Sequence, residues 1–350
     1  MRPNHNKRTN DNLPGVARAF YITMSKVLSK PSPLTTGDYL LSTKHFFTPS
    51  KLLYAQITDL FDEVWPTVTA MKNLRWQVKG YHEQYDVPQN DQLTRKFVEP
   101  NDKTNRSNLY RAFIIESWED TEYRICRNLL INIFALYEAW ADDMAKILGV
   151  PQKGDMLQFP TSNINRNYLT LLTQLQASPN PIVRDSWYSK YKSTNSQYNY
   201  ALLDNWLTEY RYFKECRNCI VHSAGIANQR VLDAYNRISG FTTADLDVSE
   251  VPETYTPIVG KRIKLTLRGV VGFSQIILKL VSTFDVEFIK CQGADKYLID
   301  TLKVLFPNTF GTDTFRKEKQ TNYITSKAHL QKPLFPDQVY LLLKQNGIMR

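Results

Sequence analysis

The stretch ECRNCIVHSAG, residues 215–225, brings together Arg217, Asn218 and His222, three side chains suited to chemistry on a phosphodiester. A histidine can take or give a proton near neutral pH, because its unperturbed pKa is about 6.5. A guanidinium presents several donors in fixed geometry to the extra negative charge of a pentacoordinate phosphate. Asn218 can hydrogen-bond either the histidine or a phosphate oxygen. The set predicts cleavage of RNA by its own 2′-hydroxyl, with neither a metal ion nor a cofactor.

The spacing of the motif also fits a structural role. On an ideal helix Arg217 and His222 diverge by about 140°, so they meet only if the helix end frays or if a second copy of the chain supplies the partner. Lys214, Asn218 and His222 follow one another at i, i+4 and i+8 on one polar face, which makes Lys214 a supporting candidate. Basic residues in the last turn of a helix also interact favourably with the helix dipole, whatever the function.

A second arginine and histidine pair shows that the spacing alone does not identify a catalytic site. Arg75 and His82 stand seven positions apart in RWQVKGYH, where Gly80 and Tyr81 are expected to break the helix between them. The interpretation of Arg217 and His222 as a catalytic pair therefore depends on the secondary structure around them.

Those elements are predicted to be helices. The motif ends a helix expected from about residue 200 to 222, with Gly225 just beyond its end. The clearest signal in the chain is a helix from Ser117 to Gly149, because Ser117 and Asp120 form a capping pair and Gly149 with Pro151 provides the stop. The inner face of the motif helix consists of apolar residues at helical spacing: Leu203, Trp206, Tyr210, Phe213 and Ile220.

The remaining pattern predicts an all-α helical bundle with a small β-hairpin insertion and extra helices at both ends. Helices are expected at residues 16–30, from about 52 to 78 with Pro66 kinking or dividing the second, and at 269–289, 295–306 and 337–346. Residues 80–107 read as a loop, and residues 255–267 as a hairpin that turns at Gly260 and Lys261. We expect three regions: residues 1–104, residues 105–292 with the bundle, and residues 293–350.

The order of these elements, with RNLLINIFALYEAWADDMAKIL in the first long helix and ECRNCIVHSAG at the end of the next, resembles the HEPN superfamily. That family's signature is an arginine, a polar residue and a histidine four to six residues after the arginine, which Arg217, Asn218 and His222 match. The resemblance spans about residues 108–291 and implies a dimer in which two motifs share one cleft. It departs from the toxin subgroup with a tyrosine two residues after the histidine, since Ala224 stands there.

The resemblance implies a metal-independent endoribonuclease of antiphage defence, abortive infection or toxin–antitoxin systems, with a defence-system or antitoxin partner. The alternative it leaves open is a non-catalytic module that binds RNA, a nucleotide or a protein partner. Glu138, on the inner stretch of the first bundle helix, is a candidate to orient Arg217, or a structural partner of some other base.

Charge favours an anionic partner. The formal net charge is +10 and the pI about 9.2, and such a surface concentrates nucleic acid or anionic lipid around it. Four basic residues, Lys261, Arg262, Lys264 and Arg268, cluster in and after the predicted hairpin. They are candidates to follow an RNA backbone, or equally the exposed face of a two-stranded ribbon.

Two other patterns are read as structural. Cys216 and Cys219 have a metal-ligand spacing without a second pair, and are taken as small core residues. Asp285, Glu287 and Lys290 in DVEFIK come near a metal-dependent nuclease motif, but the lysine falls one position too late, so a solvated helix face is expected. We expect no metal site.

The chain is expected to be a soluble, cytoplasmic protein. Its first 15 residues lack the apolar core of a secretory signal, and no run reaches the roughly 18 uninterrupted apolar residues of a membrane span. Four scattered cysteines in 350 residues are too few for a disulfide framework, and a reducing compartment fits them.

Overall fold

The computed structural model describes residues 42–85, 90–98, 108–150, 157, 167–176, 181–311 and 316–350. The helix predicted for residues 16–30 lies outside these ranges. The described part is mostly helical, as predicted, and its β structure consists of two isolated bridges.

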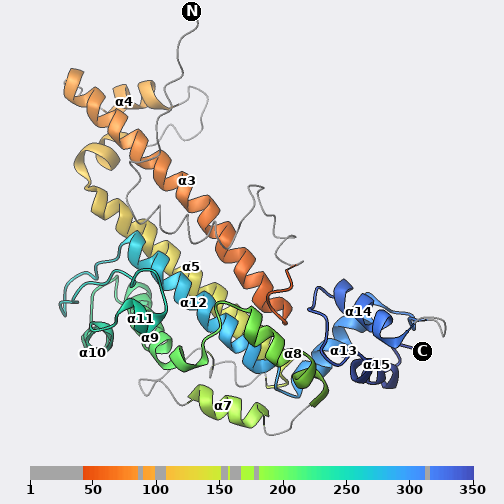
Figure 1. Ribbon diagram of the computed structural model, residues 1–350. Coiled ribbons are helices and arrows are strands. Elements are labelled where there is room, and N and C mark those ends of the chain that lie inside the picture. Colours follow the sequence, from red (N-terminus) through yellow and green to blue (C-terminus); the bar gives the residue numbers. More distant parts are fainter. Residues whose placement is uncertain are drawn as a thin grey trace, which may run out of the picture.

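Three long helices, α3 (Thr48–Tyr85), α5 (Trp118–Ile147) and α12 (Leu267–Phe288), run side by side through the molecule (Figure 1). The motif helix α9 (Leu203–His222) packs against α5, α12 and the shorter α10 (Gln229–Ile238). The short elements η3 (Tyr200–Leu202) and α11 (Thr243–Leu246) flank α9. Both α9 and α5 therefore pack into one helical bundle, as predicted.

The predicted ends of α5 are confirmed. The Ser117 hydroxyl accepts a hydrogen bond from the Asp120 backbone N–H at 3.0 Å and donates to the Asp120 carboxylate at 2.8 Å. At the other end Gly149 has a φ of +76°, a conformation that glycine adopts without the cost a side chain brings. The local sequence was enough to predict this helix, because the residues that determine each of its ends lie close together in the chain.

Helix α3 differs from the prediction, because it runs unbroken through Pro66 for 38 residues and ends only at Tyr85. The predicted loop at residues 80–107 therefore starts later, and it contains the helix α4 (Asn90–Phe97). Arg75 ties α3 to the π-helix η1 (Arg111–Ile115), donating to the carbonyls of Ala112 at 3.2 Å and Glu116 at 2.5 Å. A small second core shared by these segments explains the longer helix: Val78, Leu93, Leu109 and Phe113.

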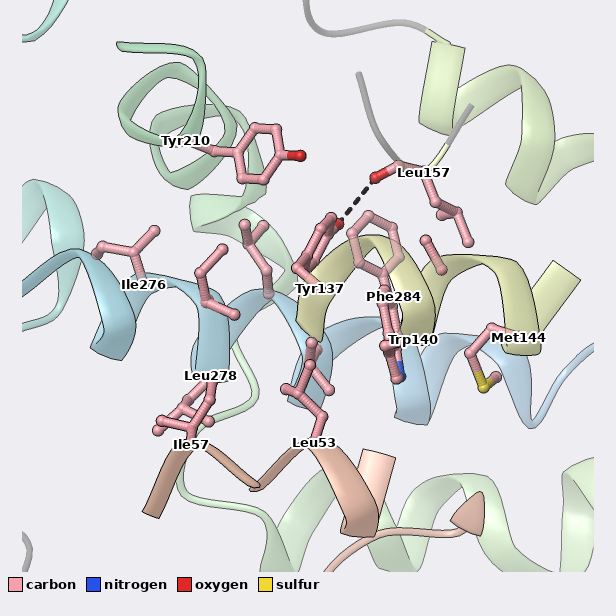
Figure 2. Packing of buried hydrophobic residues seen from close by; sticks show 14 of the residues in the cluster. Leu53, Ile57, Tyr137, Trp140, Met144, Leu157, Tyr210, Ile276, Leu278 and Phe284 are labelled. Atoms are coloured by element: carbon pink, nitrogen blue, oxygen red, sulfur yellow. Dashed lines mark hydrogen bonds between the residues drawn. The ribbon is translucent and has the colours of Figure 1, made fainter. Parts of the chain in front are cut away.

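The main core lies between the long helices. Figure 2 shows Tyr137, Trp140 and Met144 of α5 among side chains of the neighbouring helices. The Tyr137 hydroxyl donates to the Leu157 carbonyl at 2.9 Å, so this buried polar atom is satisfied. The cluster is continuous along the chain, from Phe46 before α3 to Met349 near the C-terminus.

Helix α12 is the one described helix that is long and apolar enough to cross a membrane. However, 94% of its most apolar window is buried inside the bundle. That is the arrangement of a core helix in a soluble protein, since a membrane-spanning helix keeps an apolar face for lipid.

Several helices lie in segments whose apolar periodicity is weak. Helices α7 (Asn167–Gln176) and α8 (Pro181–Thr194) lie between the two predicted bundle helices, in a stretch where no helix is predicted. Trp187 and Tyr191 of α8 are fully buried, and Trp187 donates to the Gln331 carbonyl at 2.6 Å. The C-terminal helices α13 (Gly293–Leu305) and α15 (Pro336–Gln345) confirm the prediction, whereas α14 (Lys317–Lys327) lies between them, in a segment where no helix is predicted.

The predicted hairpin at residues 255–267 is not observed. The turn is present, with Gly260 at a φ of +82° and a hydrogen bond from the Lys261 N–H to the Ile258 carbonyl. Instead of pairing within itself, the segment pairs with residues 225–227 just after α9. The Ala227 N–H donates to the Lys261 carbonyl at 2.8 Å, and Ile226 and Arg262 form an antiparallel bridge. The end of α9 supplied a partner that the local sequence did not reveal.

Candidate functional site

Helix α9 is held in place by an aromatic inner face. The predicted core residues of this helix are all buried. Phe213 stacks on Phe273 of α12 with ring centroids 4.5 Å apart, and Tyr210 lies 5.2 Å from Phe134 of α5. The Trp206 indole N–H donates to the Leu246 carbonyl at 2.8 Å. This packing fixes which face of α9 its polar residues occupy.

Arg217 and Glu138 form an ion pair between α9 and α5, with Nη2 and Oε2 3.2 Å apart. Both side chains are partly buried, being 23% and 26% exposed. The Arg217 Nη1 also donates to the Asn218 side-chain oxygen at 3.3 Å. The guanidinium thus donates to two acceptors and is still partly exposed to solvent.

Lys214 extends this group of charges. It is buried, and its ammonium lies 5.7 Å from the centroid of the Tyr210 ring. Burial lowers the pKa of Lys214 to about 8, the Glu138 carboxylate opposes that change, and the charges of Arg211 and Arg217 add to it. A lysine in this setting loses its proton more easily than an exposed one.

His222 occupies the last position of α9 and is exposed to solvent. Helix α9 stays regular to its end, where the N–H groups of Ser223 and Gly225 both donate to the Cys219 carbonyl. No hydrogen bond joins the described side chains of Arg217 and His222, in keeping with the divergence of about 140° on a regular helix. The structure brings Arg217, Asn218, Glu138 and Lys214 together and leaves His222 at the edge of the group.

The turn after His222 is tightly packed. Gly225 has a φ of +81°, and a Cβ added there would lie 2.2 Å from the Tyr123 hydroxyl oxygen of α5. Arg262 lies over the ring of Tyr123, with the guanidinium carbon 5.3 Å from the ring centroid. Glycine at this position lets the chain after α9 approach α5 closely.

The four basic residues near the turn are all exposed. Three of them contact neighbouring groups. Arg262 lies 3.5 Å from the Asp120 carboxylate, the Lys264 ammonium lies 3.6 Å from the Tyr255 ring centroid, and Arg268 pairs with Glu250. Lys261 has no ion pair among the described residues. The cluster forms an exposed basic edge beside the end of α9.

The structure corrects the reading of DVEFIK as a solvated face, because Asp285 and Glu287 are buried. Asp285 accepts hydrogen bonds from the backbone N–H groups of Phe46 at 2.7 Å and Phe47 at 3.1 Å, just before α3. Glu287 accepts one from the Tyr198 hydroxyl at 2.8 Å. These carboxylates hold segments of the bundle together.

Cys216 and Cys219 are buried free thiols on α9, as the reading of them as small core residues predicted. Burial raises the pKa of both, which makes the thiolate forms less available.

Three buried charged residues of α9 were not singled out from the sequence. Arg211 and Glu215 form an ion pair within the helix, with side chains only 10% and 3% exposed. Glu209 is 1% exposed. The i, i+4 spacing of Arg211 and Glu215 was a visible signal for the pair, but such pairs usually lie on the surface, and their burial follows from the packing of the chain around α9.

Comparison with family models, with curated proteins and with solved structures gives no match to this chain.

Proposed function

We propose that this chain is a metal-independent endoribonuclease of the HEPN type, acting in the cytoplasm as a homodimer. The observation that carries the proposal is the Arg217 guanidinium, fixed by Glu138 and Asn218 two turns of α9 or less from the solvent-exposed His222. An anchored guanidinium and an exposed imidazole are the groups that metal-free RNA cleavage needs.

In the proposed reaction the RNA 2′-hydroxyl attacks the adjacent phosphorus and the bond to the 5′ oxygen breaks. The products are a 2′,3′-cyclic phosphate and a 5′-hydroxyl end. His222 takes the proton of the 2′-hydroxyl or returns one to the leaving oxygen, a role that contributes about 100-fold or more in rate. Arg217 stabilises the charge on the pentacoordinate phosphate, and Asn218 positions one of these two groups.

Glu138 is assigned the role of orienting Arg217. A guanidinium held by a carboxylate and by an amide oxygen keeps a further N–H on each of its two terminal nitrogens for a phosphate, and loses less side-chain freedom when the substrate binds. Lys214, buried beside the same pair, adds positive charge and is a supporting residue.

A homodimer is proposed because His222 and Arg217 point apart on one helix, so the histidine of a second copy is the natural partner for Arg217. Apolar side chains are exposed near His222 in the chain and on the turn that pairs with residues 225–227. Such an exposed patch is typical of an interaction surface. Its members are Val221, Ile226, Ile258 and Val259.

The test is cleavage of a labelled RNA in the presence of EDTA, with the product ends identified. We expect the wild-type protein to cut and leave a cyclic phosphate, and His222→Ala and Arg217→Ala to lose about 100-fold or more of the rate. The matched control is His82→Ala, because Arg75 and His82 form the chain's other arginine–histidine pair and Arg75 is bound to the carbonyls of Ala112 and Glu116. Cleavage unaffected by His222→Ala, or lost equally in His82→Ala, would reject the assignment.

A second candidate function is a non-catalytic HEPN-like module that binds RNA, a nucleotide or a defence-system partner, such as an antitoxin. It is favoured by the pairing of Arg217 with Glu138 inside one subunit. This candidate predicts binding of RNA or nucleotide without any cleavage, and no change in binding when His222 is replaced by alanine.

A further inference from the structure

We infer that the C-terminal helices carry a separate binding site for single-stranded RNA, formed by the stacked rings of Phe310 and Tyr323 and the basic stripe of α14. The rings and the stripe are called here the aromatic platform. The inference deepens the proposed function, on which it rests for the choice of RNA as ligand.

The platform begins with three aromatic rings in a row. Phe310 and Tyr323 are stacked almost in parallel, with an interplanar angle of 11° and centroids 5.4 Å apart. Phe306 meets Phe310 edge to face, also at 5.4 Å. Tyr323 is 47% exposed, and Phe310 covers one side of its ring. A half-exposed flat ring of this kind can stack an unpaired base.

The rings are held by rigid backbone. The Phe310 N–H donates to the Ile348 carbonyl at 2.8 Å, and the Phe310 carbonyl accepts from the Arg350 N–H at 3.1 Å. Tyr323 lies on α14, which packs against α15. Because the rings are already ordered, a base that stacks on them loses little to ordering the protein.

Positive charge surrounds the exposed ring. Arg316, Lys319, Tyr323 and Lys327 recur at three or four residues, so they form one stripe along α14. Lys319 and Lys327 lie on either side of Tyr323, each about 6 Å away along the helix axis. The Lys327 ammonium is 5.5 Å from the Tyr323 ring centroid. All three cations are exposed, and none of them has an ion pair with another described residue.

Charge decides between occupants of this face. A protein partner or a second copy that covered the rings would have to neutralise three exposed cations, whereas a polynucleotide supplies both a base for the ring and phosphates for the cations. The ligand should be single-stranded, because bases within a duplex have no free face to stack on a side chain.

The platform lies far from His222. The start of α12 is close to the end of α9, since the Ile263 N–H donates to the Gly225 carbonyl, and the other end of α12 leads into α13 (Figure 1). The 22 residues of α12 span about 33 Å. The platform therefore binds a part of the RNA remote from the bond that is cut and contributes affinity without touching the reacting atoms.

The experiment measures the anisotropy of a short labelled oligouridine titrated with full-length His222→Ala protein, so that cleavage does not enter the result. We expect Tyr323→Ala to raise the Kd about 10-fold and Tyr323→Phe, which keeps the ring, to change it by less than about twofold. The matched control is Tyr85→Ala, which removes an exposed tyrosine of α3. The double variant Lys319→Gln/Lys327→Gln should lower the slope of log affinity against log salt by about 1.4.

Equal Kd values for Tyr323→Ala and Tyr85→Ala overturn the inference, as does a salt slope that the lysine changes leave unaltered. A duplex of the same sequence that competes as well as the single strand also overturns it. A change of oligomeric state in Tyr323→Ala without a change in Kd would identify the face as a protein interface instead. Because the Kd is measured without catalysis, this experiment tests the aromatic platform independently of the proposed nuclease activity. A wild-type protein that does not cleave RNA would contradict the nuclease proposal and would not change the measured Kd values.

Discussion

Replacing Glu209 with glutamine should stabilise the protein, and increasingly so as the pH rises. Glu209 is 1% exposed, and one of its carboxylate oxygens has no hydrogen-bond partner among the described residues. Burial raises the pKa of this carboxyl from 4.5 to about 8. The folded protein therefore keeps a proton at neutral pH that the unfolded chain has released.

The sign and the size of the effect follow from this difference in pKa. Between pH 4.5 and 8 the folded state binds more protons than the unfolded state, so the free energy of unfolding falls as the pH rises. The fall is about 1.4 kcal/mol per pH unit, which amounts to about 3 kcal/mol by pH 7. Glutamine has nearly the shape of the protonated acid and does not titrate, so Glu209→Gln should remove this pH-dependent loss.

The assay is urea unfolding of the wild type and the variant at several pH values between 5 and 8. We expect the difference in unfolding free energy to grow by about 1.4 kcal/mol per pH unit in favour of the variant. Glu63→Gln, at an exposed position of α3, is the matched control and should stay within about 0.5 kcal/mol of the wild type. A difference that is constant with pH, or that shrinks as the pH rises, would refute the argument that Glu209 is protonated in the folded protein.

Three further substitutions test the packing of the bundle. Gly225→Ala should destabilise the protein by well over 1 kcal/mol in urea unfolding, because a Cβ at this positive φ would also lie 2.2 Å from the Tyr123 hydroxyl. Gly149 has a similar φ of +76°, but a Cβ added there would have no other atom within 4 Å, so Gly149→Ala should cost only about 1 kcal/mol. Equal losses of stability in the two variants would contradict the predicted clash with Tyr123. Trp187→Ala should cost about 3–5 kcal/mol, since it empties a fully buried site and leaves the Gln331 carbonyl without its donor. A loss below about 1 kcal/mol in the same assay would show that α8 does not anchor the C-terminal segment.

Local sequence predicted those helices whose ends and faces are locally encoded. The capping pair of Ser117 and Asp120 and the glycine at 149 bound α5, and the apolar spacing from Leu203 to Ile220 gave the buried face of α9. Arg217, Asn218 and Glu138 were also selected from the sequence, and in the fold both Glu138 and Asn218 lie within hydrogen-bonding distance of Arg217. Residue type and helical period were sufficient for the buried face of α9, because neighbours along the chain are also neighbours on the helix, whereas the contact of Glu138 with Arg217 joins two helices.

Tertiary structure decided whatever depends on partners distant in the chain. The segment around Gly260 pairs with residues 225–227 instead of with itself, and α8 is a helix although its local pattern is weak. Asp285 is buried because the backbone N–H groups of Phe46 and Phe47, more than 200 residues away, supply its hydrogen bonds. A charged side chain shows its type in the sequence, but the free energy of burying it depends on donors that only the folded chain brings to it.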